Sequence, residues 1–581
     1  MARTRRALPI QYVLTLALTC LTAPLLFANV ARFVAPIYGH FLASQYHFHA
    51  ATASVLIGGV LGYFRVPKNA RLPLSIGIAS LLGLMIGYMR FSFDYSGTLG
   101  PTFGPLVSMA IVYPVLGLQA AALVSRLPQK KMDSALLVCG VLVGSFLNAK
   151  KVDTLARKLV DVKTCGIIDL AIYGWITLAF LDALDMWPRT VDVPSPALQE
   201  EKSNADSKGE KKGKKRTSGK QEEKKETGVQ STAPLPASDG RSVMSKSFNL
   251  ILAIALPLLL RSSFDGGLQC NLPSVKPEQH GKYSILARDE SVTGYLSVIE
   301  DPNLHDGTRF LRCDHSLIGG AYLQHEMDSV FGSFYYLDFV RFVDRKKDDT
   351  ERALQIGLGI GVTTRSLTLH TPIQVDLVEL DPIVYTYARK YFDLPEPHSV
   401  HFGDGRAFLD ESPDGVYDYV LHDVFTGGLV PSTLFSVEAL QNVRRVLKPN
   451  GVLALNYVGT LDSLATKAVI KTLHTVFPNL ECYTEDPKEA AGPDAIYNIV
   501  FFASSKRIVF LPPSQDDMAR GGLYAEFLKT FDDHRVDLDF RTVAGELMTD
   551  KKNMLPKLQI ESAKKHWKVM RTLFGIEFWG V

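Results

Sequence analysis

The sequence predicts two unlike parts, an α-helical multipass membrane domain followed by a soluble α/β domain with a parallel, doubly wound sheet. Long apolar stretches recur over residues 1–190, and from about residue 280 short β-type runs alternate with helical stretches. The charge divides at the same place, because residues 1–190 hold 17 Lys and Arg against 7 Asp and no Glu. The whole chain of 581 residues has a formal net charge of only +3. This split excludes a single soluble globule and a basic nucleic-acid binder, so no nucleic acid partner is expected.

The membrane prediction depends on the length of the apolar segments, which lie at about 8–30, 50–64, 72–89, 104–125, 134–148 and 166–187. A helix needs ~20 mostly apolar residues to cross a bilayer, and the first, third, fourth and sixth segments meet that length. The second and fifth segments are short. Further apolar segments follow the first one directly, so we expect it to be a retained helix and not a signal peptide. The expected partner of this part is the lipid bilayer.

Basic residues between these segments indicate an orientation. Arginines and lysines in residues 3–6, 65–71 and 126–131 place the N-terminus and alternate loops in the cytosol. A spanning fifth segment would place Lys150, Lys151, Arg157, Lys158 and Lys163 outside, and these residues interrupt the pattern. Either the fifth segment is re-entrant or the charge rule fails there.

Residues 191–246 read as a disordered, charged linker, since they are rich in Pro, Ser and Lys and have almost no large apolar residues. Residues 247–261 form a short apolar segment, either membrane-spanning or interfacial. Six spans and an interfacial segment would put the soluble domain in the cytosol, whereas a seventh span would put it on the other side. None of the asparagines lies in an Asn-x-Ser/Thr sequon, which favours the cytosol.

Glycines and acidic residues stand at the ends of successive predicted strands in the soluble part. The strand 353–356 leads into Gly357-Leu358-Gly359-Ile360-Gly361, a loop whose backbone could approach a ligand closely. Glu379 closes the next strand 22 residues after Gly357, where a ribose-binding carboxylate is expected. Asp404 and Gly405 follow the third strand, and Asp423 ends the fourth. The pattern indicates an adenosine-type ligand, with a structural turn and a cap as the alternatives for Gly357 and Glu379.

The stretch from about 282 to 505 resembles the spermidine/spermine synthase (polyamine aminopropyltransferase) family. The resemblance depends on Thr293-Gly294-Tyr295-Leu296-Ser297-Val298-Ile299-Glu300, Leu377-Val378-Glu379-Leu380-Asp381-Pro382, Gly403-Asp404-Gly405 and Tyr417-Asp418-Tyr419-Val420-Leu421-His422-Asp423. It implies a Rossmann-like core of the class I methyltransferase type with a small N-terminal β-subdomain. On this basis residues 262–350 are a β-rich subdomain with a helix, 351–510 the nucleoside-binding core and 511–581 a C-terminal helical extension.

The resemblance also implies a chemistry, aminopropyl transfer from decarboxylated S-adenosylmethionine to a polyamine or other small amine, in a homodimer. The glycines of the loop, with Gly405, would cradle the donor, Glu379 would hold the ribose and Asp404 would meet the adenine. Asp423 would be the catalytic acid/base on the acceptor side, because an amine must lose its proton to attack a carbon beside a sulfonium. Tyr335 and Thr426 are weaker substrate candidates, and the aromatic segment around Tyr335 could equally be a core stripe. No metal is expected, since Cys and His show no ligand spacing.

Two positions depart from the family pattern. The synthases carry an acid in the glycine loop that pairs with the donor's ammonium, and here that position is Ile360. The second acid of their D-x-x-D motif is replaced by Thr426. Without the loop acid, intact S-adenosylmethionine is no longer repelled. A methyltransferase that uses S-adenosylmethionine is therefore the alternative enzyme, and a non-catalytic membrane sensor or scaffold is the alternative outside enzymes.

Overall fold

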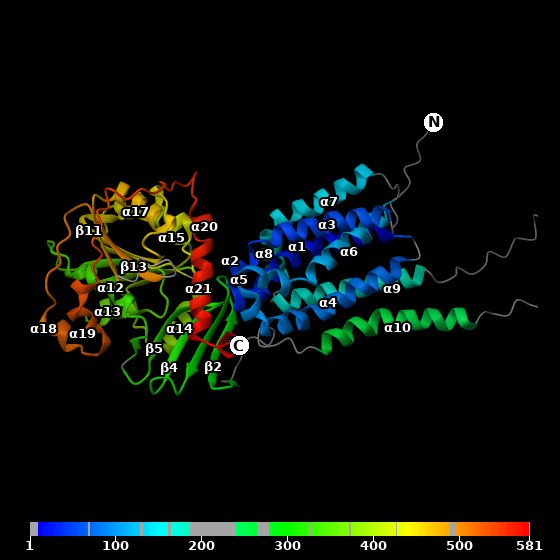
Figure 1. Ribbon diagram of the computed structural model, residues 1–581, viewed down its shortest axis with the longest axis horizontal. Coiled ribbons are helices and arrows are strands. Elements are labelled where there is room, and N and C mark those ends of the chain that lie inside the picture. Colours follow the sequence, from blue (N-terminus) through cyan, green and yellow to red (C-terminus); the bar gives the residue numbers. More distant parts are fainter. Residues whose placement is uncertain are drawn as a thin grey trace, which may run out of the picture.

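A computed structural model describes residues 10–64, 66–67, 70–127, 132–160, 164–185, 240–263, 278–325, 327–370, 373–425, 427–487 and 496–579. Figure 1 shows two bodies side by side, a bundle of long helices and an α/β body that contains the C-terminal helices. Residues 191–239 of the predicted linker lie outside the described residues. The predicted apolar segment 247–261 lies within a longer helix that begins at Gly240.

The helical body is built almost entirely from the apolar segments of the sequence. In the part of the chain that the structure describes, its helices are α1 (Ile10–Tyr38), α2 (His40–Ser44), α3 (His47–Phe64), α4 (Arg71–Asp94), α5 (Ser96–Ser108), α6 (Val112–Ser125), α7 (Met132–Leu147), α8 (Ala149–Val160), α9 (Thr164–Asp185) and α10 (Gly240–Ser262). By length and composition, four stretches could cross a membrane, namely Ile10–Tyr38, Arg71–Asp94, Ser96–Ser125 and Thr164–Ala183.

The fifth predicted segment is a bent helix pair. Helices α7 and α8 are long and apolar enough to span a membrane only when they are taken together, and they meet at an angle of 69°. Lys150 and Lys151, which interrupt the charge pattern of the sequence, lie on α8 and are exposed. The bend therefore separates the apolar α7 from a basic helix that runs in another direction.

Polar contacts between helices lie at the two ends of the bundle. At one end Arg126 and Ser75 both donate to the carboxylate of Asp182, at 2.5 and 2.7 Å, and so join the end of α6, the start of α4 and the end of α9. At the other end Arg261, near the end of α10, pairs with Asp169 near the start of α9 at 2.6 Å. Helix α10 therefore runs antiparallel to α9, and it ends on the side of the α/β body (Figure 1).

The first part of the α/β body is an antiparallel sheet in sequential order. Its strands are β1 (Glu278–His280), β2 (Tyr283–Glu290), β3 (Tyr295–Asp301), β4 (Thr308–Cys313), β5 (Ser316–Tyr322) and β6 (Asp328–Ser329). Alternating apolar residues and turn-forming Asp and Gly between the runs produce this meander. A short helix, α12 (Ser333–Asp338), and a 3-10 turn, η3 (Phe339–Phe342), lead into the next sheet.

The second sheet is the Rossmann-like core, with strands in the order β12-β13-β11-β10-β7-β8-β9. The strands are β7 (Glu351–Ile356), β8 (Ile373–Glu379), β9 (Ser399–Phe402), β10 (Tyr417–His422), β11 (Leu447–Gly459), β12 (Asn479–Thr484) and β13 (Tyr497–Ser504). The helices are α13 (Val362–His370), α14 (Pro382–Tyr391), α15 (Gly405–Glu411), α16 (Val437–Val446), α17 (Leu464–Val476), α18 (Gln515–Ala519), α19 (Gly522–Lys529), α20 (Leu555–Leu558), α21 (Ile560–Leu573) and α22 (Ile576–Trp579).

The core sheet is mixed, which corrects the expectation of a purely parallel sheet. Strands β11, β10, β7, β8 and β9 are parallel, as the alternation of strands and helices predicts. Strand β13 is antiparallel to both β11 and β12, because it turns back after β12 and lies between these two strands. The class I methyltransferase-type fold with a small β-subdomain is nevertheless present.

The two bodies share one apolar core. Tyr38 of α1, Phe310 of β4 and Trp567 of α21 are buried in the same hydrophobic cluster. The indole N–H of Trp567 donates to the backbone carbonyl of Ile37 at 2.8 Å, which fixes the C-terminal helix against the end of α1. The C-terminal extension therefore packs between the sheets and the bundle.

Close backbone contact between α3 and α6 gives a test of the bundle. An alanine Cβ at Gly58 would lie 1.9 Å from the carbonyl oxygen of Gly117, so Gly58→Ala must push the two helices apart. We expect a loss of about 2 kcal/mol, seen as a lower melting temperature of the detergent-solubilised protein. Gly77→Ala in α4 is the matched control, because a Cβ there meets nothing within 4 Å and the helix gains propensity. Equal melting temperatures of the two variants would contradict the packing of α3 on α6.

Candidate functional site

The predicted site residues meet at one edge of the core sheet. The backbone N–H of Gly357 donates to the carbonyl oxygen of Val378 at 2.9 Å, and that of Asp423 donates to Ile356 at 2.9 Å. The N–H of Gly403 donates to the carbonyl oxygen of Glu379 at 3.0 Å. Backbone hydrogen bonds thus connect the carboxyl ends of β7, β8, β9 and β10. In open α/β sheets this is the edge at which ligands bind.

The glycine loop needs glycine for conformation and for space. Gly357 and Gly359 have φ values of 85° and 58°, a region that L-residues with a side chain avoid. A Cβ at Gly357 would lie 2.0 Å from the carbonyl oxygen of Asp423, and one at Gly359 would lie 2.7 Å from that of Ile318. The loop therefore passes in close contact with β10 and β5 before α13 begins at Val362.

Glu379 connects the glycine loop to the turn after β8. One carboxylate oxygen accepts from the backbone N–H of Leu358 at 2.9 Å, and the other accepts from that of Asp381 at 2.8 Å. Only 7% of Glu379 is exposed, and burial raises its pKa to about 7. A carboxylate has about four acceptor sites in all, so Glu379 retains acceptor capacity for a donor such as a ribose hydroxyl.

Asp404 and Gly405 form the start of α15. Asp404 is the N-cap, and its side chain accepts from the backbone N–H of Arg406 at 2.7 Å. The Asp404 side chain is exposed and its second oxygen is free for another donor. A Cβ at Gly405 would lie 2.6 Å from the Ile356 side chain, which is why this helix can approach β7 closely.

Asp423 has a partner that sequence reasoning missed. The side-chain amide of Asn456, on β11, donates to the Asp423 carboxylate at 2.9 Å. Asp423 lies in a partly buried position, and burial raises its pKa to about 6, against the opposing effect of this hydrogen bond. Asn456 is itself buried, and its carbonyl oxygen has no partner among the described residues. The signal in the sequence was a single amide within the apolar run 452–457.

His422, next to Asp423, belongs to the core. Its ring is fully buried and packs edge-on against Phe435 at 5.0 Å between ring centroids. Burial lowers the pKa of His422 to about 4, so the ring is neutral at physiological pH. It supports the strand end without adding charge to the site.

Ile360, the fourth residue of the glycine loop, is the position at which the resemblance to the synthases implies an acid. Its side chain is buried in an apolar cluster with Leu358 and Leu377, and it lies directly over Gly319 of β5. A Cβ at Gly319 would come within 2.6 Å of it. The position is therefore an apolar contact between the core and the β-subdomain.

The weaker substrate candidates are Tyr335 and Thr426, and the structure describes only the first of them. The Tyr335 hydroxyl donates to Asp328 at 2.8 Å and accepts from the N–H of Ser329 at 2.8 Å. Its ring packs against the rings of Tyr524 and Phe527. These contacts fit the alternative interpretation, in which the aromatic segment around Tyr335 is part of the core. Thr426 lies outside the described residues. Within the residues that are described, no cluster of three or more His, Cys, Asp or Glu could hold a metal ion.

Parts of the chain are similar to known proteins. Residues 334–504 match the Spermine/spermidine synthase domain. The N-terminal histidine N-methyltransferase of Emericella nidulans is 36% identical over 328 residues, which cover 51% of this chain and 58% of that protein. The polyamine aminopropyltransferase of Vibrio vulnificus is 36% identical over 115 residues, which cover 19% of this chain and 38% of that protein.

A solved structure of a probable spermidine synthase from Corynebacterium glutamicum aligns with 45% of this chain and 95% of its own, with 19% identity and a TM-score of 0.37. The chain spans 58% and 38% of the lengths of the two curated relatives above. Residues 334–504, within the α/β part of this chain, are similar to the spermine/spermidine synthase domain, and they follow an N-terminal bundle of apolar helices.

Proposed function

We propose that this protein is an S-adenosylmethionine-dependent N-methyltransferase. The observation that carries the proposal is Ile360, an apolar side chain buried with Leu358 and Leu377, which carries no charge that could pair with the ammonium group of a decarboxylated donor. A lost charge-assisted hydrogen bond weakens binding by about tenfold or more. The alignment with the Emericella nidulans protein, 36% identical over 328 residues and named an N-methyltransferase, supports the same choice.

The donor fits the strand-end site through residues of this chain. The backbone of Gly357 and Gly359 leaves room that a Cβ would fill. Glu379 has lone pairs for the ribose hydroxyls, and Asp404 has a free oxygen for the adenine amine. The donor itself supplies an electrophilic methyl group on a sulfonium.

Asp423 and Asn456 would receive the acceptor nitrogen. The nitrogen lone pair forms the new N–C bond, the methyl–sulfur bond breaks, and the donor leaves as a neutral thioether. The proton that the nitrogen loses passes to the Asp423 carboxylate, which is ionised at neutral pH and close enough in basicity to accept it. The free carbonyl oxygen of Asn456 can accept a second hydrogen bond from the acceptor. An N-terminal histidine of a peptide is the first acceptor to test.

Aminopropyl transfer to a polyamine is the second candidate. The match of residues 334–504 to the synthase domain and the carboxylate of Asp423 favour it. A non-catalytic sensor is the third, because Ile360 and Thr426 replace two acids of the synthase pattern.

A turnover assay on the full, detergent-solubilised chain separates these candidates. Both donors are offered against a histidine-initiated peptide, putrescine and spermidine, and the products are weighed by mass spectrometry. We expect a gain of about 14 Da from S-adenosylmethionine, since a methyl group replaces a proton. A gain of about 57 Da would instead establish aminopropyl transfer, and the absence of both products with retained nucleoside binding would establish the sensor.

The Asp423 carboxylate predicts opposite effects on rate and stability. Its folded pKa of about 6 lies above the ordinary value of 3.8, so the folded state holds this proton more tightly than the unfolded chain. Stability therefore falls as the pH rises from about 4 to about 6, while kcat rises up to about 6 and then levels off.

At pH 7.5, Asp423→Asn should lower kcat by ~100-fold or more, keep the donor Kd and not lower the melting temperature. Unchanged turnover would remove Asp423 from the mechanism.

The helical bundle is proposed to lie in a membrane. Large apolar side chains such as Ile57 and Leu137 are 61% and 69% exposed on it, which is costly in water and favourable in lipid. Ile10 at the start of α1 and the start of α10 lie at one end of the bundle, because the other ends of these helices, at Ile37 and Arg261, lie toward the α/β body. With the N-terminal end in the cytosol, α10 is a further crossing and the catalytic domain lies on the opposite face. This proposal replaces the expectation of a cytosolic domain.

Glycan mapping in a eukaryotic secretory host tests the two faces. Asp206→Thr completes a sequon at Asn204 of the linker, and His305→Thr completes one at Asn303, in an exposed turn between β3 and β4. We expect glycosylation at Asn303 only, seen as a glycosidase-sensitive shift in gel mobility. Glycosylation at Asn204 only would restore the cytosolic placement.

A further inference from the structure

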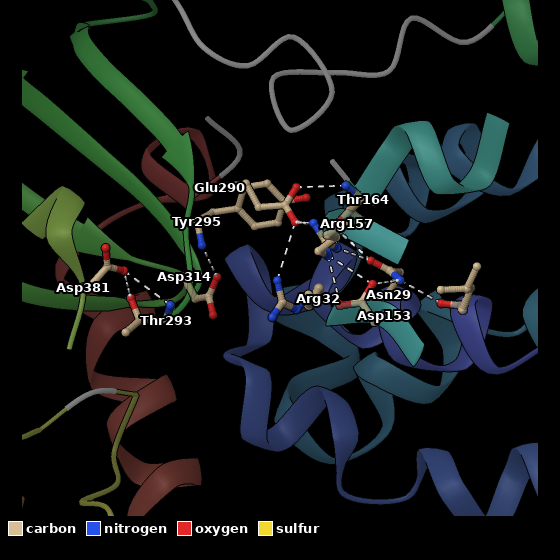
Figure 2. Close-up of polar contacts among 11 residues, drawn as sticks. Asn29, Arg32, Asp153, Arg157, Thr164, Glu290, Thr293, Tyr295, Asp314 and Asp381 are labelled. Carbon is tan, nitrogen blue, oxygen red and sulfur yellow. Dashed lines mark hydrogen bonds and ion pairs between the residues drawn. The ribbon is translucent and has the colours of Figure 1, made fainter. Parts of the chain in front are cut away.

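A carboxylate of the β-subdomain is held by the helical bundle. Glu290, the last residue of β2, has a side chain that is 3% exposed (Figure 2). Arg157 of α8 donates to it at 2.7 Å, and Thr164 at the start of α9 donates to it through its hydroxyl at 2.7 Å and its backbone N–H at 3.0 Å. Arg32 of α1 also pairs with Glu290, at 3.6 Å, so this carboxylate is tied to three helices of the bundle.

The bundle holds Arg157 in a fixed position. Its guanidinium pairs with Asp153 one turn earlier on α8, at 2.9 Å. Asn29 of α1 donates to the same Asp153 carboxylate at 2.8 Å and accepts from Arg157. Arg157 also donates to the Thr164 hydroxyl of α9 at 3.1 Å. Contacts from α1, α8 and α9 thus orient the cation that faces Glu290, which favours a rigid contact over a mobile surface pair.

The turn that follows Glu290 reaches the cofactor side of the domain. The Ser291 hydroxyl donates to Asp381 at 2.6 Å, and the Thr293 hydroxyl donates to the other oxygen of Asp381 at 2.5 Å. Asp381 is fully buried and also caps α14 through the N–H of Ile383 at 2.9 Å. The ends of β2 and β8 are thereby joined.

Asp381 contacts the proposed ribose-binding acid directly. Its backbone N–H donates to Glu379 at 2.8 Å, and the second oxygen of Glu379 accepts from Leu358 in the glycine loop at 2.9 Å. A continuous path of hydrogen bonds and one short peptide segment therefore runs from Arg157 to the donor site.

We propose that Glu290 is a positioning residue for the donor nucleoside, through which the helical bundle holds Asp381, Glu379 and the glycine loop in their binding geometry. The inference rests on the proposed function, since it assumes that the donor occupies the strand-end site. Glu290 touches no substrate in this scheme. Its effect is to reduce the freedom that the loop would otherwise lose when the donor binds.

The test measures donor binding and turnover separately on the full chain in detergent. We expect Glu290→Gln to weaken the Kd for S-adenosylmethionine, measured by calorimetry, by about tenfold. The KM for the donor should rise by a similar factor, with kcat at saturating donor within about twofold of wild type. Arg157→Lys keeps the charge without the forked geometry and should give an intermediate Kd.

Glu300→Gln is the matched control. Glu300 pairs with Arg309 at 2.8 Å within the same sheet, and both side chains are 21% exposed. Its removal should leave the donor Kd unchanged. Faster hydrogen–deuterium exchange at residues 357–361 in Glu290→Gln, but not in Glu300→Gln, is the second expected result, and it requires no turnover.

The outcomes separate this inference from the proposed function. Equal donor Kd values in wild type, Glu290→Gln and Arg157→Lys would overturn the positioning role and leave the methyltransferase proposal standing. A wild-type protein that binds neither donor would overturn both. If Glu290→Gln does not fold, Thr164→Val gives the deciding comparison, because it removes one side-chain hydrogen bond to Glu290 and no charge.

Discussion

The two backbone amides that donate to Glu379 are the contacts on which the site depends. A carboxylate that is 7% exposed needs such donors, because an unpaired buried charge is unstable. By accepting from Leu358 and Asp381, it fixes the distance between the glycine loop and the turn after β8. Asp404 follows β9, which pairs with β8, and Asp423 follows β10, which pairs with β7. The register of the parallel strands therefore sets the spacing of the site residues.

The site was predictable to the extent that its signals are local. Gly357, Glu379, Asp404 and Asp423 follow successive strands, and parallel pairing brings the carboxyl ends of strands to one edge. The antiparallel insertion of β13 was not predictable in the same way, because strand partners are chosen by contacts that are distant in sequence. Asn456 was overlooked since one amide in an apolar strand has no spacing that marks it.

The contact between the bundle and the β-subdomain was invisible in the sequence for a related reason. Arg157 and Lys158 are among the basic residues that break the orientation rule, and no sequence pattern marks Glu290. In the structure α8 meets α7 at 69°, and Arg157 of α8 lies 2.7 Å from Glu290 of the sheet. The residues that seemed to contradict the membrane pattern are thus partly the ones that join the two bodies.

The apolar cluster that contains Tyr38, Phe310 and Trp567 has a consequence for how the chain unfolds. Because these side chains are buried by one another across the two bodies, neither body can open without exposing the apolar surface of the other. Heat or denaturant should then act on them as one cooperative unit. A fragment cut between the bundle and the sheet would expose an apolar, aggregation-prone face. The folding unit therefore includes both bodies, although the sequence changes from membrane-like to soluble between them.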